Sequence, residues 1–260
     1  KSSLHLSPPW AWAFLGGLLG LLLTSLLNLP ARWLTAALQE FTQGRMVFQD
    51  SRGTAWNGSA QLTLTGGAGS TDASTLPGRL AWGIRPAWNG VRADLYADCC
   101  MQRAWGLSIL PRWGGATVLL ADSQSQWPAQ WLAGLGTPWN TVQLEGNLML
   151  LTQGLSVNWA EGRMALAGRV QLDAERVASR LSTLKPMGSY RMVLSGGVTP
   201  TLALETLQGS LQLSGHGQWT GARLHFEGEA RAAPERLEAL SNLLNIIGQR
   251  DGARAIIKVG

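Results

Sequence analysis

Charged side chains are scarce in this sequence. Asp, Glu, Lys and Arg make up 14% of its 260 residues, well below the roughly 25% of an average soluble domain. The 21 basic and 16 acidic residues are scattered along the chain and give a net charge of +5. No block of Lys or Arg is present, and such a block is the usual electrostatic footprint of a nucleic-acid interface. The sequence therefore predicts no nucleic-acid partner.

Signatures of catalysis are also missing. The chain has no HExxH, GxSxG, P-loop or glycine-rich dinucleotide motif. Each of these motifs places a metal ligand, a nucleophile or a phosphate cradle at a fixed spacing. We therefore expect no enzymatic activity, no catalytic residues, no cofactor and no small-molecule substrate.

Cysteine is nearly absent, and the only two cysteines, Cys99 and Cys100, are adjacent. An adjacent pair cannot connect distant parts of a fold. A redox switch or a zinc site is one interpretation, but zinc needs more ligands than Asp98, the one neighbouring candidate. We favour a local loop constraint in an oxidising compartment, or two reduced thiols, and we expect no metal.

One long segment lacks charge altogether. Residues 6–31 contain no charged side chain. Within them, residues 10–29 would form a helix of ~30 Å, about the thickness of the hydrocarbon core of a bilayer. Trp10 and Trp12 lie at one end and Trp33 lies just past the other, as in the aromatic belt of a spanning helix. This pattern predicts a membrane anchor.

The anchor divides the chain into four parts. We expect a short cytoplasmic tip over residues 1–9, a transmembrane signal-anchor helix over 10–30, and a membrane-exit helix and linker over 31–43. A β-rich domain over 44–260 follows. A cleavable signal peptide is the alternative for the apolar segment, but its core would normally run for only ~7–15 residues.

Beyond the anchor, a recurring pattern favours β-hairpins. Tryptophan is followed within a few residues by glycine and then by alternating apolar and polar residues, at Trp56/Gly58, Trp88/Gly90, Trp113/Gly115, Trp159/Gly162 and Trp219/Gly221. Glycine supplies the positive φ of a tight turn, and a residue period of two indicates a strand. We expect each tryptophan to end the incoming strand and cover the turn with apolar area.

The predicted fold is mainly β. It is a large antiparallel, strongly twisted or barrel-like sheet with a few short helices, and the sequence leaves open whether the sheet closes. Strands are expected over 46–50, 59–65, 78–84, 90–97, 105–110, 115–121, 141–150, 154–159, 163–173, 189–196, 201–206, 209–219, 222–231 and 254–259. Short helices are expected over 31–40, 128–135, 174–184 and 234–247.

Two histidines near the C-terminus form the sharpest site hypothesis. If Thr220 and Gly221 are a two-residue turn, His216 lies opposite His225, with Glu227 two positions away. Such a cluster could bind a metal or sense pH. A one-residue change of register would destroy the cluster, and we favour two solvated histidines on a polar face.

The chain resembles protein N of the bacterial type II secretion system. The resemblance lies in LPARWL (29–34), GTAWNGSAQLTLTGG (53–67) with LPGRLAWGIRP (76–86), GRVQLDAERVASRLSTLKPMGSYRMVLSGG (168–197) and the segment 207–260. These stretches span nearly the whole chain in the family's order. None of them is a catalytic signature, since each is a strand, turn or helix pattern.

The resemblance implies an accessory component anchored in the bacterial inner membrane by a single helix, with most of the chain in the periplasm. It implies that the protein contacts other inner-membrane or periplasmic components and takes part in the export of folded proteins across the outer membrane. It supplies no list of functional residues. The alternative function is a membrane-anchored protein whose curved sheet forms an apolar groove that binds or transfers lipid.

Overall fold

The computed structural model describes residues 10–160, 162–221 and 223–260. Its helices are α1 (Trp10–Leu27), α2 (Ala31–Phe41), α3 (Trp139–Val142) and α4 (Leu237–Ile247), with 3₁₀ helices η1 (Ala129–Leu135) and η2 (Pro234–Arg236). Its strands are β1 (Met46–Gly53), β2 (Asn57–Thr65), β3 (Ala73–Thr75), β4 (Leu80–Ala87), β5 (Gly90–Ala97), β6 (Trp105–Arg112), β7 (Gly115–Leu120), β8 (Ser123–Pro128), β9 (Leu144–Ala160), β10 (Arg163–Ser179), β11 (Gly188–Ser195), β12 (Thr201–Gly209), β13 (Leu211–Thr220), β14 (Arg223–Ala232), β15 (Gln249–Asp251) and β16 (Arg254–Val259).

All strands belong to one antiparallel sheet. Its order is β1-β2-β4-β5-β6-β7-β9-β10-β11-β12-β13-β14-β16-β15, with β3 paired to β2 and β8 paired to β9. Most neighbouring strands are also consecutive along the chain, as in a meander. The sheet does not close, since β1 and β15 are its two ends. The prediction of a mainly β, antiparallel fold is confirmed, and the barrel-like alternative is not observed.

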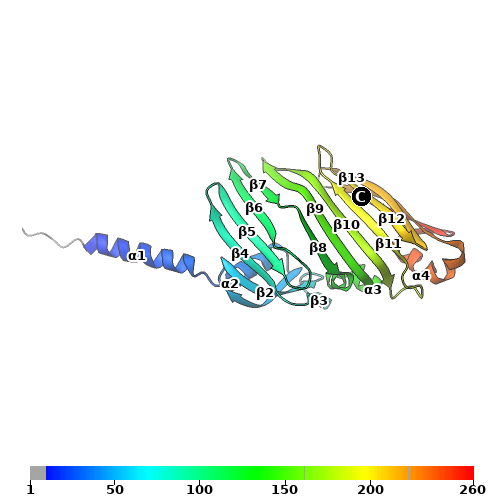
Figure 1. Ribbon diagram of the computed structural model, residues 1–260, viewed down its shortest axis with the longest axis horizontal. Coiled ribbons are helices and arrows are strands. Elements are labelled where there is room, and N and C mark those ends of the chain that lie inside the picture. Colours follow the sequence, from blue (N-terminus) through cyan, green and yellow to red (C-terminus); the bar gives the residue numbers. More distant parts are fainter. Residues whose placement is uncertain (1–9, 161, 222) are drawn as a thin grey trace, which may run out of the picture.

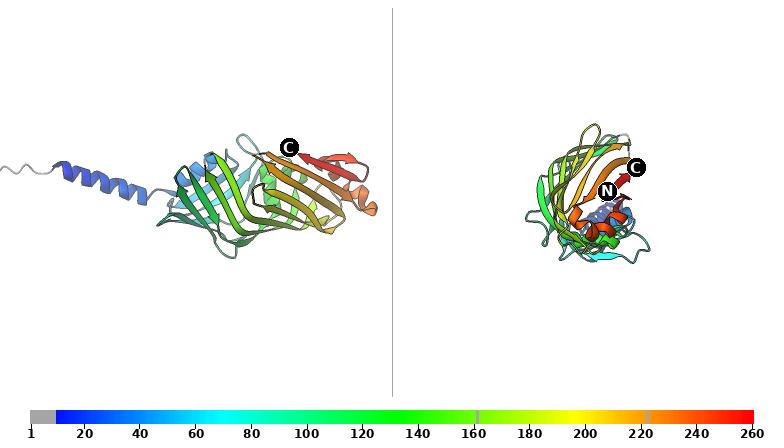
Figure 2. Two further views of the ribbon diagram at one scale, coloured as in Figure 1. Left: turned by 90° about the horizontal axis from the view of Figure 1, so that it is seen from above. Right: turned by 90° about the vertical axis from the view of Figure 1, so that its right-hand side faces the viewer.

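The sheet is curved like a gutter (Figures 1 and 2). Its strands lie side by side across the long axis of the domain, and α1 leaves the domain at the β1–β2 end (Figure 1). The end-on view in Figure 2 shows the helices gathered on the concave side of the sheet. The sheet therefore has a convex face without helices and a concave face that helices cover in part.

Three clusters of buried apolar residues form the core, and each one joins a helix to the concave face. At the C-terminal end, Leu240 and Leu244 of α4 pack with strand residues such as Tyr190 and Ala255. Near the β5–β6 loop, Trp131 of η1 packs with residues around Leu76. At the N-terminal end, the buried Ala31 and the partly buried Leu34 of α2 pack with Trp82 and Ala60 of the sheet.

Helix α1 forms where the sequence predicts a helix, but it has 18 residues. In the part of the chain that the structure describes, no helix is long and apolar enough to cross a membrane. The transmembrane anchor expected over residues 10–30 is therefore not confirmed. The predicted tip over residues 1–9 lies outside the described residues.

Most predicted elements are observed, and one helix prediction is wrong. The helices predicted over 31–40 and 234–247 are confirmed by α2 and by η2 with α4, and the segment 128–135 forms η1. The predicted helix over 174–184 is instead the end of β10 and the turn after it. The register of β10 shifts between Ala174 and Val177 because of a β-bulge. The bulge places Ala174 and Val177, which are three residues apart, on the same face of the sheet, and the same spacing in a sequence is typical of one face of a helix.

The remaining differences concern short or divided strands. The sequence analysis missed β3, β8 and β15, and the strands predicted over 141–150 and 154–159 are one strand, β9. Gly154, with φ of +56°, lies where the prediction broke this strand. Its pairing with β10 shifts nearby, between Ala167 and Arg169, so the strand continues through a bulge.

Candidate interaction surfaces

The convex face carries the charged side chains in cross-strand pairs. Asp173 of β10 lies opposite Arg191 of β11, which lies opposite Glu205 of β12. Arg191 donates through Nε to Oδ1 of Asp173 at 2.7 Å and through Nη2 to Oδ2 at 2.8 Å. These hydrogen bonds lower the pKa of Asp173. A two-pronged arginine–carboxylate pair of this kind fixes strand register as well as adding stability.

Two further arginine–carboxylate groups lie on the surface. Hydrogen bonds from Arg52, and then from Arg79, lower the pKa of Asp50, while Arg231 lowers the pKa of Glu229. General acids at neutral pH need a raised carboxyl pKa. Lowered pKa values with arginine partners are the pattern of structural ion pairs.

The predicted pairing of His216 with His225 is wrong. Thr220 pairs with Arg223, which moves the register by two residues and places His216 opposite Glu227 and His225 opposite Gln218. The turn therefore lies one residue further along the chain than the sequence analysis assumed. Across residues 10–160, 162–221 and 223–260, no group of three or more His, Cys, Asp or Glu could hold a metal ion.

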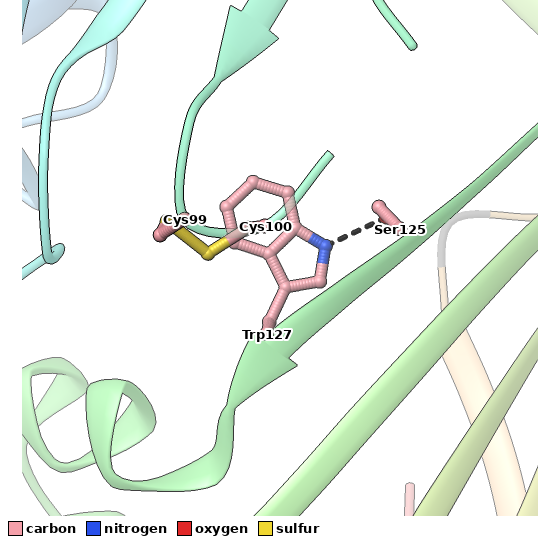
Figure 3. Close-up of a disulfide and its surroundings, with 4 residues drawn as sticks. All are labelled: Cys99, Cys100, Ser125 and Trp127. Carbon is pink, nitrogen blue, oxygen red and sulfur yellow. Dashed lines mark hydrogen bonds between the residues drawn. A yellow bond between two sulfur atoms is a disulfide. The ribbon is translucent and has the colours of Figure 1, made fainter. Parts of the chain in front are cut away.

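Cys99 and Cys100 form a disulfide in the loop between β5 and β6 (Figure 3). Cys100 is buried in the same cluster as Met101, and the partly buried Trp127 packs against this cluster. The ring nitrogen of Trp127 donates to Oγ of Ser125 at 2.8 Å. The disulfide thus constrains a packed loop, which agrees with the local constraint that the sequence analysis favoured.

The sequence analysis missed the aromatic group beside the disulfide. Trp127 stacks on Trp131 with ring centroids 5.4 Å apart, and Trp105 meets Trp127 edge-on at 6.0 Å. The three rings come from β8, η1 and β6. Trp127 and Trp131 are four residues apart, but no local pattern links Trp105 to them, because Trp105 comes close only when the bridge between Met101 and Ser125 brings the β5–β6 loop against β8.

The Trp–Gly turns all lie at one rim of the sheet. They join β1 to β2, β4 to β5, β6 to β7, β9 to β10 and β13 to β14, and in an antiparallel meander such alternate turns share one edge. The side chains of Trp88 and Trp113 are fully exposed, at 105% and 106%, and that of Trp159 is 60% exposed. The expectation that each tryptophan covers its own turn is therefore wrong for these three.

Trp56 and Gly58 instead hold the junction with α1. The ring nitrogen of Trp56 donates to the carbonyl oxygen of Leu26 at 2.7 Å. A Cβ on Gly58 would lie 2.6 Å from the carbonyl oxygen of Arg52 and 2.7 Å from the Trp82 ring. Glycine is required here because backbone and ring approach too closely for a side chain.

Trp219 and Gly221 form the turn after β13. Trp219 lies opposite Leu224 and is partly buried, and Gly221 has φ of +64°. This turn has the backbone conformation that glycine adopts without strain. Trp219 is thus a residue of β13 next to the turn, and Gly221 is a turn residue of the rim.

The two ends of the sheet are also accessible. Each end strand pairs with one strand of the main sheet order, β1 with β2 and β15 with β16. Strand β15 covers β16 only at Arg254–Ile256, whereas β14 pairs along all of Arg254–Val259. Unpaired strand edges can accept a strand from another protein.

The structure thus shows an open curved sheet with ion pairs on its convex face and exposed tryptophans at its rim. The chain matches the family Type II secretion system (T2SS), protein N over residues 44–257. The chain belongs to this family and takes part in type II secretion. No curated protein and no solved structure matches it.

Proposed function

We propose that this chain is an accessory component of the type II secretion system that acts by contacting other components, without chemistry of its own. Family membership supports the choice of partners. The observation that carries the proposal is the rim with Trp88, Trp113 and Trp159 exposed. Tryptophan is enriched at the energetic centres of protein interfaces, and several exposed rings along one rim suit a partner that covers them.

The proposed location is the inner membrane, with the sheet in the periplasm. The Cys99–Cys100 disulfide supports an oxidising compartment. The apolar side chains of α1, including Phe14, Leu19 and Leu22, are mostly exposed, and a membrane is a natural environment for such a surface.

We expect the full chain to remain in membranes after alkaline washing and to be digested by protease in spheroplasts. Recovery in the wash, or protection from protease, would contradict this location.

The contact proposal is tested by photocrosslinking in secreting cells. A photoreactive phenylalanine derivative replaces Trp88 or Trp113 in the full chain, and a matched probe replaces Tyr96 on the convex face, which is 37% exposed. We expect crosslinks to secretion components from the rim probes and few from Tyr96. Crosslinks of equal yield from all three positions would show that the rim is not the contact surface.

A double substitution measures the contribution of the rim to secretion. Trp88→Ser with Trp113→Ser removes two fully exposed rings, so the melting temperature should stay within about 2 °C of the parent because surface changes are nearly neutral. Loss of two interface anchors should weaken the contact at least tenfold. Unchanged secretion by the double variant at native protein level would reject the rim as the functional surface.

A further inference from the structure

Charge is segregated between the two faces over most of the sheet, and Arg250 of the short end strand β15, which pairs with Ala255, is an exception among the described residues. In the registers of β4–β7, β9–β14 and β16, each charged residue lies on the convex face. Examples are the pairs Arg85–Arg92, Asp173–Arg191 and Glu227–Lys258. The residues between them on the concave face are mainly Leu, Val, Ile, Ala and aromatic residues. Whatever occupies the concave face must therefore be uncharged and apolar.

The helices leave a central strip of the concave face uncovered. The three core clusters of the described residues do not include Leu107, Ile109, Val118, Val157, Leu166, Leu194 or Leu202. Successive pairs join them across the sheet, among them Ile109–Val118, Val118–Val157 and Val157–Leu166. These side chains are partly exposed or, for Ile109, 36% exposed. These residues lie on β6 to β12, and with strands ~4.8 Å apart the strip is ~24 Å long.

Several polar groups on the concave face already have partners, although the buried ring nitrogen of Trp105 has none. Tyr190 donates to the carbonyl oxygen of Leu211 at 3.0 Å, and Oγ of Ser123 lies 2.8 Å from Oγ1 of Thr152. Thr206 donates through Oγ1 to the carbonyl oxygen of Leu213. The face thus offers hydrocarbon contact and almost no free hydrogen bonds. An extended peptide would bury unpaired backbone groups there, which is unfavourable, whereas an acyl chain has no such groups.

A cationic group lies on the convex face close to the rim, two residue pairs from the β4–β5 turn, so only that rim separates it from the strip. Arg85 and Arg92 are directly opposite each other on β4 and β5, and Arg112 ends the next strand. Like charges placed directly opposite are unfavourable. No acidic partner of Arg85 or Arg92 is present among the residues that the structure describes. An anionic phosphate at this rim would relieve the repulsion and accept hydrogen bonds from both arginines.

We propose that the concave face binds phospholipid, with acyl chains on the uncovered strip and the headgroup passing over the rim, so that its phosphate meets Arg85 and Arg92 on the convex side. The apolar helix α1 joins the domain at one end of the gutter (Figure 1), which puts the strip within reach of a membrane source. This site is additional to the rim contacts with secretion components, and either assignment can fail without the other.

Photocrosslinking in cells tests the site with two neighbouring residues of β7. Val118 lies on the concave face, and Leu119, which is 39% exposed, lies on the convex face. A photoreactive phenylalanine derivative is placed at either position in the full chain, and adducts are identified by mass spectrometry. We expect at least tenfold more phospholipid adduct at Val118 than at Leu119. Equal yields, no lipid at Val118, or a protein adduct there would overturn the proposal, and a free fatty acid adduct would exclude phospholipid.

Charge substitution supplies a second test with a matched control. Val157→Lys with Leu166→Lys places two cations in the strip, whereas Ser156→Lys with Ala167→Lys places them at the next pair, on the convex face. We expect phospholipid that copurifies with the full chain to fall at least fivefold in the first variant only. Arg85→Gln with Arg92→Gln should lower it about threefold. Equal loss in the two lysine variants, at native circular dichroism, would contradict binding in the strip.

Discussion

At the scale of single residues, the convex surface depends on ion pairs between neighbouring strands. The side chain of Asp173 is only 12% exposed, and it accepts hydrogen bonds from Gln171 and Arg191. A carboxylate with so little contact to water keeps its charge because the guanidinium replaces the lost hydration. This pair therefore has more influence on stability than the more exposed pairs, such as Lys185–Glu145.

Asp173→Asn should destabilise the fold by about 1 kcal/mol at neutral pH, the upper range for pairs near the surface. The pKa of Asp173 is lower in the folded state than in the unfolded chain, where it is about 3.9. The stabilisation is therefore complete above that value and disappears as the pH falls through the folded pKa. Urea unfolding at pH 7 and at low pH should show the difference between parent and variant shrinking with acid. Asp94→Asn, on the same face but without an ion pair among the described residues, is the control and should change stability at pH 7 by no more than about 0.5 kcal/mol.

Gly58 is a second position where one residue decides local structure. A methyl group there would meet the carbonyl oxygens of Arg52 and Thr54 at 2.6 and 2.8 Å, and backbone atoms cannot move aside as a flexible side chain could. Gly58→Ala should cost about 2 kcal/mol or more. Gly83→Ala is the control, because nothing lies within 4 Å of its Cβ position. The melting temperature of each variant is measured by calorimetry. If neither substitution lowers it, the close approach at Gly58 is contradicted.

At the scale of elements, register determines which residues meet. The β13–β14 hairpin places His216 opposite Glu227, and directly opposite residues have Cα atoms about 4.5–5.5 Å apart. This separation allows a disulfide, whereas diagonal neighbours about 7–8 Å apart are at or beyond its limit. His216→Cys with Glu227→Cys should therefore crosslink on oxidation, and His216→Cys with His225→Cys should not. Gel mobility with and without reductant distinguishes them, and the reverse result would restore the register first expected from the sequence.

The elements also show why the sequence predicted the hairpins better than the pairings. Turns are local, so a glycine with positive φ after an alternating strand indicates them directly, as at Gly114 and Gly221. Register is not local, since moving the turn by one residue separated His216 from His225. The last part of β10, around Val177, was predicted to be a helix because the bulge there has the residue spacing of a helix.

The candidate surfaces were predictable to different degrees. The chain resembled its family in segment order, and Cys99 with Cys100 was visible as an adjacent pair. The uncovered strip was not, because Val118, Val157 and Leu166 become neighbours only when three strands are paired. The cationic pair Arg85–Arg92 likewise depends on the β4–β5 register.

At the scale of the whole molecule, the core is divided between the two ends of the gutter. One cluster surrounds α4 at the C-terminal end, and the other two lie near η1 and α2 toward the N-terminal end. Between them the sheet is continuous, but the uncovered strip adds no buried cluster. Local stability follows buried apolar contact, so we expect the two ends to open as separate units with the centre of the sheet between them.

Leu244→Ala tests this division. Leu244 is fully buried in the α4 cluster, and its truncation should cost about 3 kcal/mol, which corresponds to about a hundredfold faster amide exchange. If the ends are separate units, this acceleration should be confined to β11, β13, β14 and β16, while β2, β4 and β5 keep their protection. Leu62→Ala, in the cluster near η1, should give the opposite distribution.

Equal acceleration of amide exchange throughout the sheet in both variants would instead show one cooperative unit. Separate ends would let the centre of the gutter widen without unfolding either core, as a strip that receives acyl chains requires.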